Sequence, residues 1–271
     1  MFSLLCRLTL GNESLYTARL QAGLGLISET KSLLLLWKPD MTVPELYRSA
    51  LESGMFPSVT ARRLRNIVVE CFATRYLVDG AAPAKHLQKL LPGLTRSDLQ
   101  QLLLLFTCRT NAILADFIYQ IYWPRYEAGD HKIHNETARA FIEQAIDDGK
   151  TVKRWSDKTI RRTASHVTGC CADYGLLEDG PRRKRKFLPF HITDLMTVYL
   201  AYDLHHRGFS DKALLNHPDW ALFGLDWDEV LAALKRLALD GWFLLQAGGE
   251  VVRISWKYPN MEAVCDVLAE G

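Results

Sequence analysis

The 271-residue chain lacks the short motifs that identify most enzyme classes. It contains no G-x-x-x-x-G-K-[ST] phosphate loop, no G-x-G-x-x-G dinucleotide fingerprint, no H-E-x-x-H helix and no G-x-S-x-G elbow. Its eight histidines are scattered, and no two carboxylates are spaced as an acid–base pair. We therefore predict a protein that is not an enzyme and that needs no cofactor.

Cysteine is scarce and is not arranged for disulfides or zinc. The six residues include no C-x-x-C pair, and they are Cys6, Cys71, Cys108, Cys170, Cys171 and Cys265. Most have apolar neighbours, which favours reduced, buried thiols in a cytoplasmic protein. His131 and His134, near Asp130 and Glu136, could in principle bind a metal, but this polar loop is a weak signal and we predict no metal site.

Long hydrophobic runs are also missing. The longest, residues 33–37 and 102–106, are far shorter than the roughly 18–20 apolar residues that cross a bilayer. Residues 1–10 are apolar but are interrupted by Arg7, and they lack the basic start and small-residue cleavage site of a signal peptide. We expect the two runs to be core segments of helices, and we expect no membrane association.

The feature that is present in excess is a local positive charge. The net charge of the chain is only +2, yet residues 150–186 contain eleven Lys and Arg residues against four acids, a net +7. The remainder of the chain must therefore sum to −5. A strongly positive segment in a nearly neutral protein creates a local field that attracts a polyanion.

The first half of the chain has the pattern of an all-helical domain, which we place at residues 14–149. A helix is expected at residues 15–28. Thr42, Pro44 and Glu45 predict a capped helix start, and Gly54 ends that helix. Ser58 is expected to cap a second helix over residues 59–77. The two helices have the lengths and the short connection of a helix-turn-helix.

The second half, residues 150–271, has the pattern of a winged-helix-like region with small β-hairpins. Ser156 predicts a helix start and Gly175 its end, and an extended basic segment follows the turn at Gly180. Residues 242–245 and 251–256, separated by a glycine pair, give the strongest hairpin signal. Residues 156–190 and 226–256 each follow the order helix, glycine, apolar run, turn and second run. The predicted fold class is therefore mainly α.

Three clusters of cations are candidate DNA contacts. The first is the start of the helix after Ser156, where a helix N-terminus meets the basic side chains Lys153, Arg154, Lys158, Arg161 and Arg162. The second is the run Arg182, Arg183, Lys184, Arg185 and Lys186, whose mutual repulsion a polyanion would relieve. The third is the start of the predicted helix at residues 59–77, with Arg62, Arg63 and Arg65.

Each cluster also has an ordinary explanation. The first could be the solvated face of a surface helix. The second could be a hydrated basic loop or a localisation signal. The third belongs to a helix pair of a kind that is common in any all-α protein. The sequence does not distinguish DNA from RNA as the partner.

An ordered set of short patterns over nearly the whole chain resembles the BrxA family of bacteriophage-exclusion (BREX) defence systems. They are Tyr16-x-x-Arg19, Phe106-x-x-Arg109, Ala115-Asp116-Phe117, Trp155-Ser156-x-x-Thr159, Gly175-Leu176-Leu177, Pro189-Phe190, Asp219-Trp220-x-x-Phe223 and Val252-x-Ile254-x-Trp256.

This resemblance implies a mostly helical protein with helix-turn-helix elements beside a positive surface, which binds double-stranded DNA. It also implies partners within a defence system that includes a methyltransferase and an ATPase. The family has been labelled a putative inner-membrane protein, and the short apolar runs give that label no support. Two alternatives stay open, a protein–protein adaptor in the same assembly and a transcriptional regulator of the defence locus.

Overall fold

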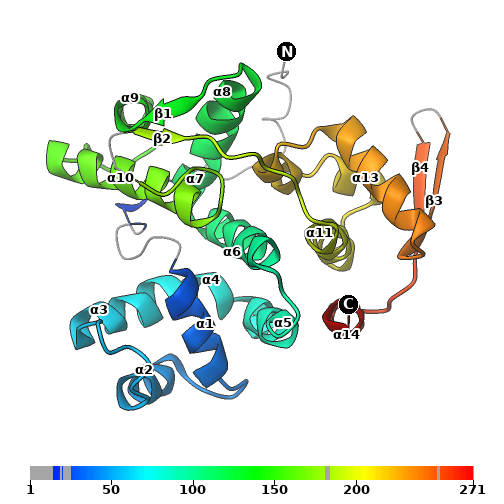
Figure 1. Cartoon of the computed structure of the whole chain (residues 1–271), viewed down its shortest axis with the longest axis horizontal. Coiled ribbons are helices and arrows are strands. Elements are labelled where there is room, and N and C mark those ends of the chain that lie inside the picture. The colour runs from blue at the N-terminus through cyan, green and yellow to red at the C-terminus, as the bar shows by residue number, and fades with distance from the viewer. Residues whose placement is uncertain (1–14, 19, 21–25, 181–183, 249–250, 271) are drawn as a thin grey trace.

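The structure is a computed structural model, and it describes residues 15–18, 20, 26–180, 184–248 and 251–270. Figure 1 shows that nearly all of the regular structure is helical. In the described residues, strands occur only as two antiparallel pairs, β1 with β2 and β3 with β4. This confirms the prediction of a mainly α fold with small β-hairpins.

The N-terminal helices form a small bundle at the lower left of Figure 1. They are α1 (Ile27–Leu36), α2 (Val43–Glu52), α3 (Ala61–Asn66), the π-helical η3 (Ile67–Phe72) and α4 (Ala73–Tyr76). Thr42 and Glu45 form the predicted capping box at the start of α2. Of the helix expected at residues 15–28, the described residues 15–17 and 26 are not helical, and α1 begins at Ile27 and includes most of the apolar run at residues 33–37. Much of that expected range lies outside the described residues.

A central helix connects the two halves of the molecule. The next elements are η4 (Asp79–Ala81), α5 (Ala82–Leu90), α6 (Arg96–Thr110), α7 (Ala112–Phe117), η5 (Ile118–Tyr122) and α8 (Trp123–Glu127). Residues 99–108 of α6 are all buried, so neighbours surround this helix on every side. The apolar run at residues 102–106 is therefore a core helix segment, as predicted.

A ribbon and two packed helices follow, at the upper left of Figure 1. They are β1 (Lys132–His134), α9 (Asn135–Asp147), α10 (Asp157–Asp173) and β2 (Lys184–Lys186). β1 and β2 pair in antiparallel register, with Lys132 opposite Lys186 and His134 opposite Lys184. A further bridge joins Leu177 to Phe187. The basic segment after Gly180 thus contains a strand that pairs with residues about fifty positions earlier in the chain.

The C-terminal elements occupy the right side of Figure 1. They are α11 (Asp194–His206), α12 (Asp211–Leu215), η6 (Pro218–Phe223), α13 (Trp227–Leu239), β3 (Phe243–Gly248), β4 (Val251–Trp256) and α14 (Met261–Glu270). β3 and β4 form the predicted hairpin, in which Gly248 is paired with Val251. α14 returns to pack on α5 and α11, so the end of the chain contacts the first half.

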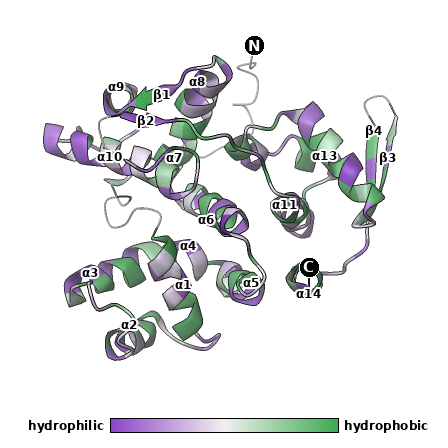
Figure 2. Cartoon of the chain, in the orientation of Figure 1, coloured by the Kyte–Doolittle hydropathy of each residue, from purple (hydrophilic) through white to green (hydrophobic). Residues whose placement is uncertain are grey.

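Buried side chains form one continuous core, and Figure 2 shows the ribbon coloured by the hydropathy of each residue. α9 and α10 pack together across the predicted domain boundary at residues 149 and 150, and that boundary stays a prediction. The five described cysteines are buried and free, as expected. Burial raises the pKa of the Cys170 and Cys265 thiols to about 12, so both are protonated and unreactive at neutral pH.

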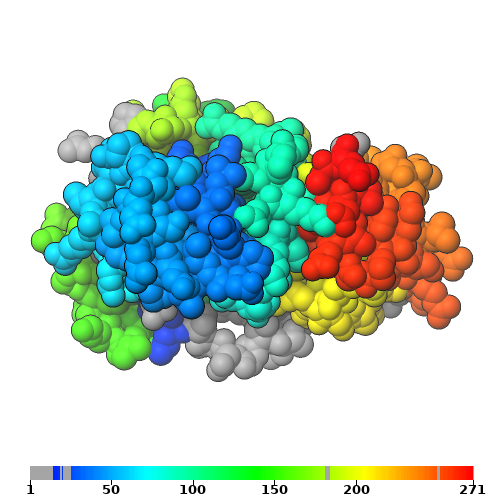
Figure 3. Space-filling view, turned by 90° about the horizontal axis from the view of Figure 1, so that it is seen from below, coloured from blue at the N-terminus to red at the C-terminus, as the bar shows by residue number. Residues whose placement is uncertain are grey.

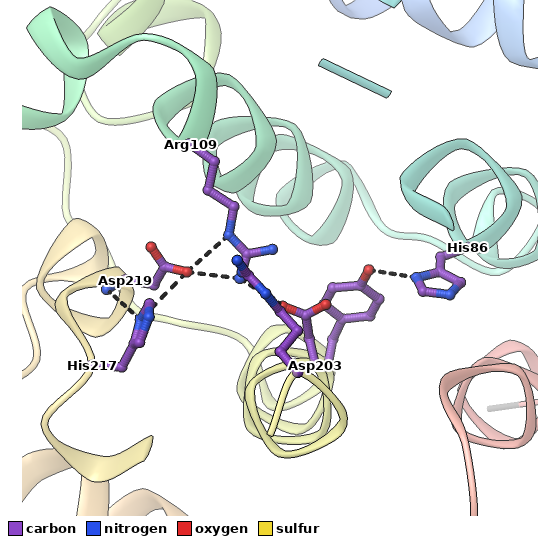
Figure 4. A network of polar contacts seen from close by, with 7 residues as sticks. His86, Arg109, Asp203, His217 and Asp219 are labelled. Carbon is purple, nitrogen blue, oxygen red and sulfur yellow. Dashed lines mark hydrogen bonds and ion pairs between the residues drawn. The ribbon is translucent and has the colours of Figure 1, made fainter. Parts of the chain in front are cut away.

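A buried ionic cluster joins α6 to the C-terminal elements (Figure 4). Arg109 of α6 donates through Nε to Asp219 over 2.9 Å and through its terminal nitrogen to Asp203 over 2.6 Å. All three side chains are less than one-fifth exposed. His217 Nδ1 accepts a hydrogen bond from the backbone N–H of Asp219, and this bond helps to hold Asp219 in position. Nearby, His86 Nδ1 lies 2.8 Å from the Tyr199 hydroxyl.

Among the described helices, none is by itself long and apolar enough to cross a membrane. The segments Arg96–Thr110 and Ala112–Glu127 meet that length and composition test only together, and they are bent by 114° at the break between them.

Replacing Arg109 with Leu should destabilise the fold strongly. The change leaves Asp203 and Asp219 buried without their shared guanidinium, and uncompensated buried charge costs about 3–5 kcal/mol. Urea denaturation measures the loss. Arg154→Leu is the control, because it removes an exposed ion pair with Asp147 that should contribute little. An R109L protein as stable as the wild type would contradict this role.

The fold should also lose stability in mild acid. Burial lowers the pKa of His86 and His217 below the ordinary value. As pH falls below about 6.5, histidines of the unfolded chain bind protons before these two do, so unfolding becomes more favourable. We expect the Tm to fall from pH 7.5 to pH 5.5, with a shallower slope in a His86→Gln, His217→Asn variant. Equal slopes would show that these histidines do not account for the effect.

Candidate nucleic-acid interface

The start of α10 presents exposed cations to solvent. The Ser156 hydroxyl accepts the Thr159 N–H and caps the helix, as predicted from the sequence. Lys153, Lys158 and Arg162 are exposed, and none of them makes an ion pair with another described residue. In Figure 2 this end of α10 is strongly hydrophilic. These three side chains are therefore free to contact an anion without first breaking an internal bond.

Two further predicted residues on this surface are already paired with acids. Arg154 lies 2.8 Å from Asp147 at the end of α9. Arg161 contacts Asp157, which also binds Arg139 of α9 over 2.7 Å. Both arginines remain largely exposed, so solvent weakens these pairs. Their net contribution to the positive field is nevertheless smaller than a count of cations implies.

The β1–β2 ribbon gathers a second group of positive charges. Antiparallel pairing places Lys132 directly opposite Lys186, and places Lys184 opposite His134. All four side chains are exposed. Lys186 has a partner in Glu178 at 3.2 Å, whereas Lys132 and Lys184 have no ion pair among the described residues. Like charges directly opposite on a ribbon repel each other, and a bound polyanion would relieve that repulsion.

Arg185 occupies the opposite side of the ribbon and differs from the sequence-based expectation. Alternate residues of a strand face opposite sides, so Arg185 points inward between two exposed lysines. Its side chain is only 8% exposed and donates to the Glu178 carbonyl and to Asp179. Arg185 therefore holds the turn before β2 and does not face solvent. Arg182 and Arg183 lie outside the described residues.

The helix of the third predicted cluster begins two residues later than expected. Thr60, and not Ser58, caps the helix, because the Val59 N–H bonds back to the Phe56 carbonyl and keeps that segment in a turn. Arg62 and Arg65 are exposed on α3, and Arg63 is half-buried. α1, α2 and α3 with η3 pack as a three-helix unit, with α3 presenting its N-terminal end to solvent.

Sequence reasoning missed Lys132. This residue stands alone in a polar loop, far along the chain from the basic run that it meets in the ribbon. No local pattern could have identified it. The neighbouring histidines, His131 and His134, are exposed, and the described residues contain no group of three side chains that could hold a metal ion.

The comparisons identify a family and a fold. A family model described as BrxA matches residues 14–203, more than half of the chain, and the chain belongs to the BrxA family. No curated protein matches it. The fold is similar to that in the "crystal structure of an uncharacterized protein from Magnetospirillum magneticum", with a TM-score of 0.56 and 14% identity, over 75% of this chain and 97% of that one.

The inward position of Arg185 can be tested by comparison with its neighbour. Arg185→Met removes donors to the Glu178 carbonyl and Asp179, so we expect a loss of about 1–3 kcal/mol in the free energy of unfolding. Lys184→Met changes an exposed residue of the same strand and should have little effect. Guanidinium denaturation measures both. Equal effects of the two substitutions would refute the inward position.

Proposed function

We propose that this member of the BrxA family binds double-stranded DNA and does not modify it chemically. Family membership makes the chain a component of a bacteriophage-exclusion (BREX) defence system. Its role there is to hold duplex DNA through cations on α10 and on the β1–β2 ribbon. Among the described residues, these are chiefly Lys158 and Arg162 on α10, Lys153 in the segment just before it, and Lys132 and Lys184 on the ribbon.

The observation that best supports this proposal is the arrangement of free and paired cations. Of the described basic residues at 150–186, Lys150 bonds to Asp116 over 2.9 Å, Arg185 is buried, and Arg154, Arg161 and Lys186 have acidic partners. Those left without an ion pair lie at or just before the start of one helix and on one ribbon. Phosphate contacts made by such side chains provide most of the affinity of non-specific DNA binding.

The order of elements also supports a duplex partner. A helical segment, α7 to α8, is followed by β1, α9, α10 and then β2, which pairs back to β1. This order is typical of winged helices, in which the second helix of the packed pair enters the major groove. By that likeness α10 is the groove helix, and the ribbon with the turn before β2 contacts the phosphate backbone.

The side chains favour binding that depends little on sequence. The exposed residues in the first two turns of α10 are mainly cations, and Arg161 is engaged by Asp157. Direct reading of bases usually needs bidentate partners such as Arg, Asn or Gln held against base edges. Arg162 is the one exposed arginine of this helix start that has no ion pair with a described residue, so any sequence preference should depend on it.

Removing pairs of free cations should weaken DNA binding. We expect the variants Lys158→Ser/Arg162→Ser and Lys132→Ser/Lys184→Ser each to lower duplex affinity, and to reduce the slope of log K against log salt by about 2, because each loses two phosphate contacts. Fluorescence anisotropy over a salt series, with a duplex of arbitrary sequence, provides the measurement.

The matched control is Lys85→Ser/Lys212→Ser, which removes the same charge from exposed positions on α5 and α12 and should change the salt slope little. If this control weakens binding as much as the other two pairs, only the total charge matters and the proposed interface is wrong. A wild-type chain that binds no duplex at low salt refutes the function and favours an adaptor with an acidic partner. If the α10 or ribbon variants lose binding to one DNA sequence and keep their affinity for others, a transcriptional regulator is favoured.

α3 provides a separate test of a second contact. Arg62→Ser/Arg65→Ser removes two exposed cations from the start of the three-helix unit. If this unit also touches DNA, affinity should fall for duplexes long enough to reach both units and should be unchanged for short ones. If the variant and the wild type bind duplexes of every length with equal affinity, binding is restricted to α10 and the ribbon.

A further inference from the structure

α13 has an exposed face, and the helix lies on the right side of Figure 1, whereas α10 lies on the left. The exposed residues recur at intervals of three and four, which places them on one side of the helix. They are Asp228, Glu229, Ala232, Lys235, Arg236 and Leu239. The opposite side is buried against the core through Val230, Leu234 and Leu237.

This face is poorly suited to DNA, although α13 precedes a hairpin just as α10 precedes the turn and strand β2. Asp226, Asp228 and Glu229 surround its N-terminus, where a groove helix would meet phosphates. Asp226 and Glu229 form a capping box, with the Asp226 N–H donating to Glu229 over 2.9 Å. Three carboxylates in one turn repel a polyanion, so α13 should have a different kind of partner.

The charges on the face are ordered along the helix. The acids lie in the first turn, the cations Lys235 and Arg236 lie near the end, and the small residue Ala232 lies midway between them. A second copy of α13 laid antiparallel across Ala232 would bring the acidic end of each helix against the basic end of the other. Such a surface is complementary to itself, which is the requirement for a two-fold dimer.

Exposed apolar residues lie beside the C-terminal end of this face. A groove of about 580 Å³ between the end of α13 and β3 is lined by Ala238, Leu239, Phe243, Leu244 and Leu245, with the two cations on its rim. Leu239 is 88% exposed and Leu244 is 71% exposed. Leu239 lies two turns after Ala232 on the same side of α13. A partner helix packed on this face would bury part of this exposed apolar surface.

We infer that α13 is a self-association surface, and that a second copy of this chain packs antiparallel against it about a two-fold axis near Ala232. Arg236 is held within its own chain by two hydrogen bonds to Asp194, of 2.8 and 2.6 Å. Lys235 makes no ion pair with a described residue. The decisive intermolecular pair therefore joins Lys235 of each copy to Asp228 of the other.

Charge reversal tests the pair without disturbing the core. Sedimentation velocity of the full chain without DNA, over roughly 1–100 µM, should show a dimer fraction that rises with concentration. Asp228→Lys and Lys235→Glu should each weaken self-association about tenfold or more, because two like-charge contacts replace two favourable pairs. Mixing the two variants should restore dimers, because both contacts in the mixed dimer are then favourable. The double variant should also associate with itself.

Asp40→Lys is the control, since it makes the same charge change at an exposed residue far from α13 and should leave association unchanged. Circular dichroism confirms that each variant is folded. A wild-type chain that is monomeric at every concentration overturns the inference. So does a dimer that both single reversals leave intact, because its contact must then lie elsewhere. Neither outcome bears on DNA binding, which is measured separately at α10 and the ribbon.

Discussion

Arg109 binds Asp203 and Asp219 at the point where the two halves of the molecule meet. Two largely buried carboxylates share one guanidinium, so separating either of them from Arg109 leaves a charge without its partner inside the protein. The contact fixes α11 and η6 against the central helix α6, and Gly224 at the end of η6 lies so close to Trp123 that an added Cβ would come within 2.8 Å of its ring. The position of the C-terminal helices and hairpin relative to the basic surface follows from this junction.

The cations of the basic segment divide into those that stabilise the fold and those that face solvent. Lys150 and Arg185 bond inward, whereas Lys158 and Lys184 do not. This division explains how a chain of nearly neutral net charge can present a usable positive surface at one end. The acids that balance the total are distributed elsewhere, and some of them gather at the start of α13, so the two ends of the molecule should have different partners.

Local signals in the sequence predicted local structure well. The capping box at Thr42 and Glu45, the cap at Ser156 and the hairpin around its glycine pair depend on residues a few positions apart. Features that depend on long-range pairing could not be predicted in the same way. The strand of Lys132 and the inward side of Arg185 are defined only once β1 meets β2, and the partner of Arg154 is set by how α9 packs on α10. The sequence therefore pointed to a basic segment whose contact with DNA stays a prediction, while which of its cations face solvent and which are paired required the structure.

The central claim is that duplex DNA contacts α10 and the β1–β2 ribbon. Hydrogen–deuterium exchange of the full chain, with and without a duplex at low salt, tests it directly because exchange reports on every segment at once. The account predicts slower exchange on DNA binding at residues 132–134, 157–162 and 184–186, with none at residues 227–239 of α13. Protection centred on α13, with the basic helix and ribbon unchanged, would contradict it.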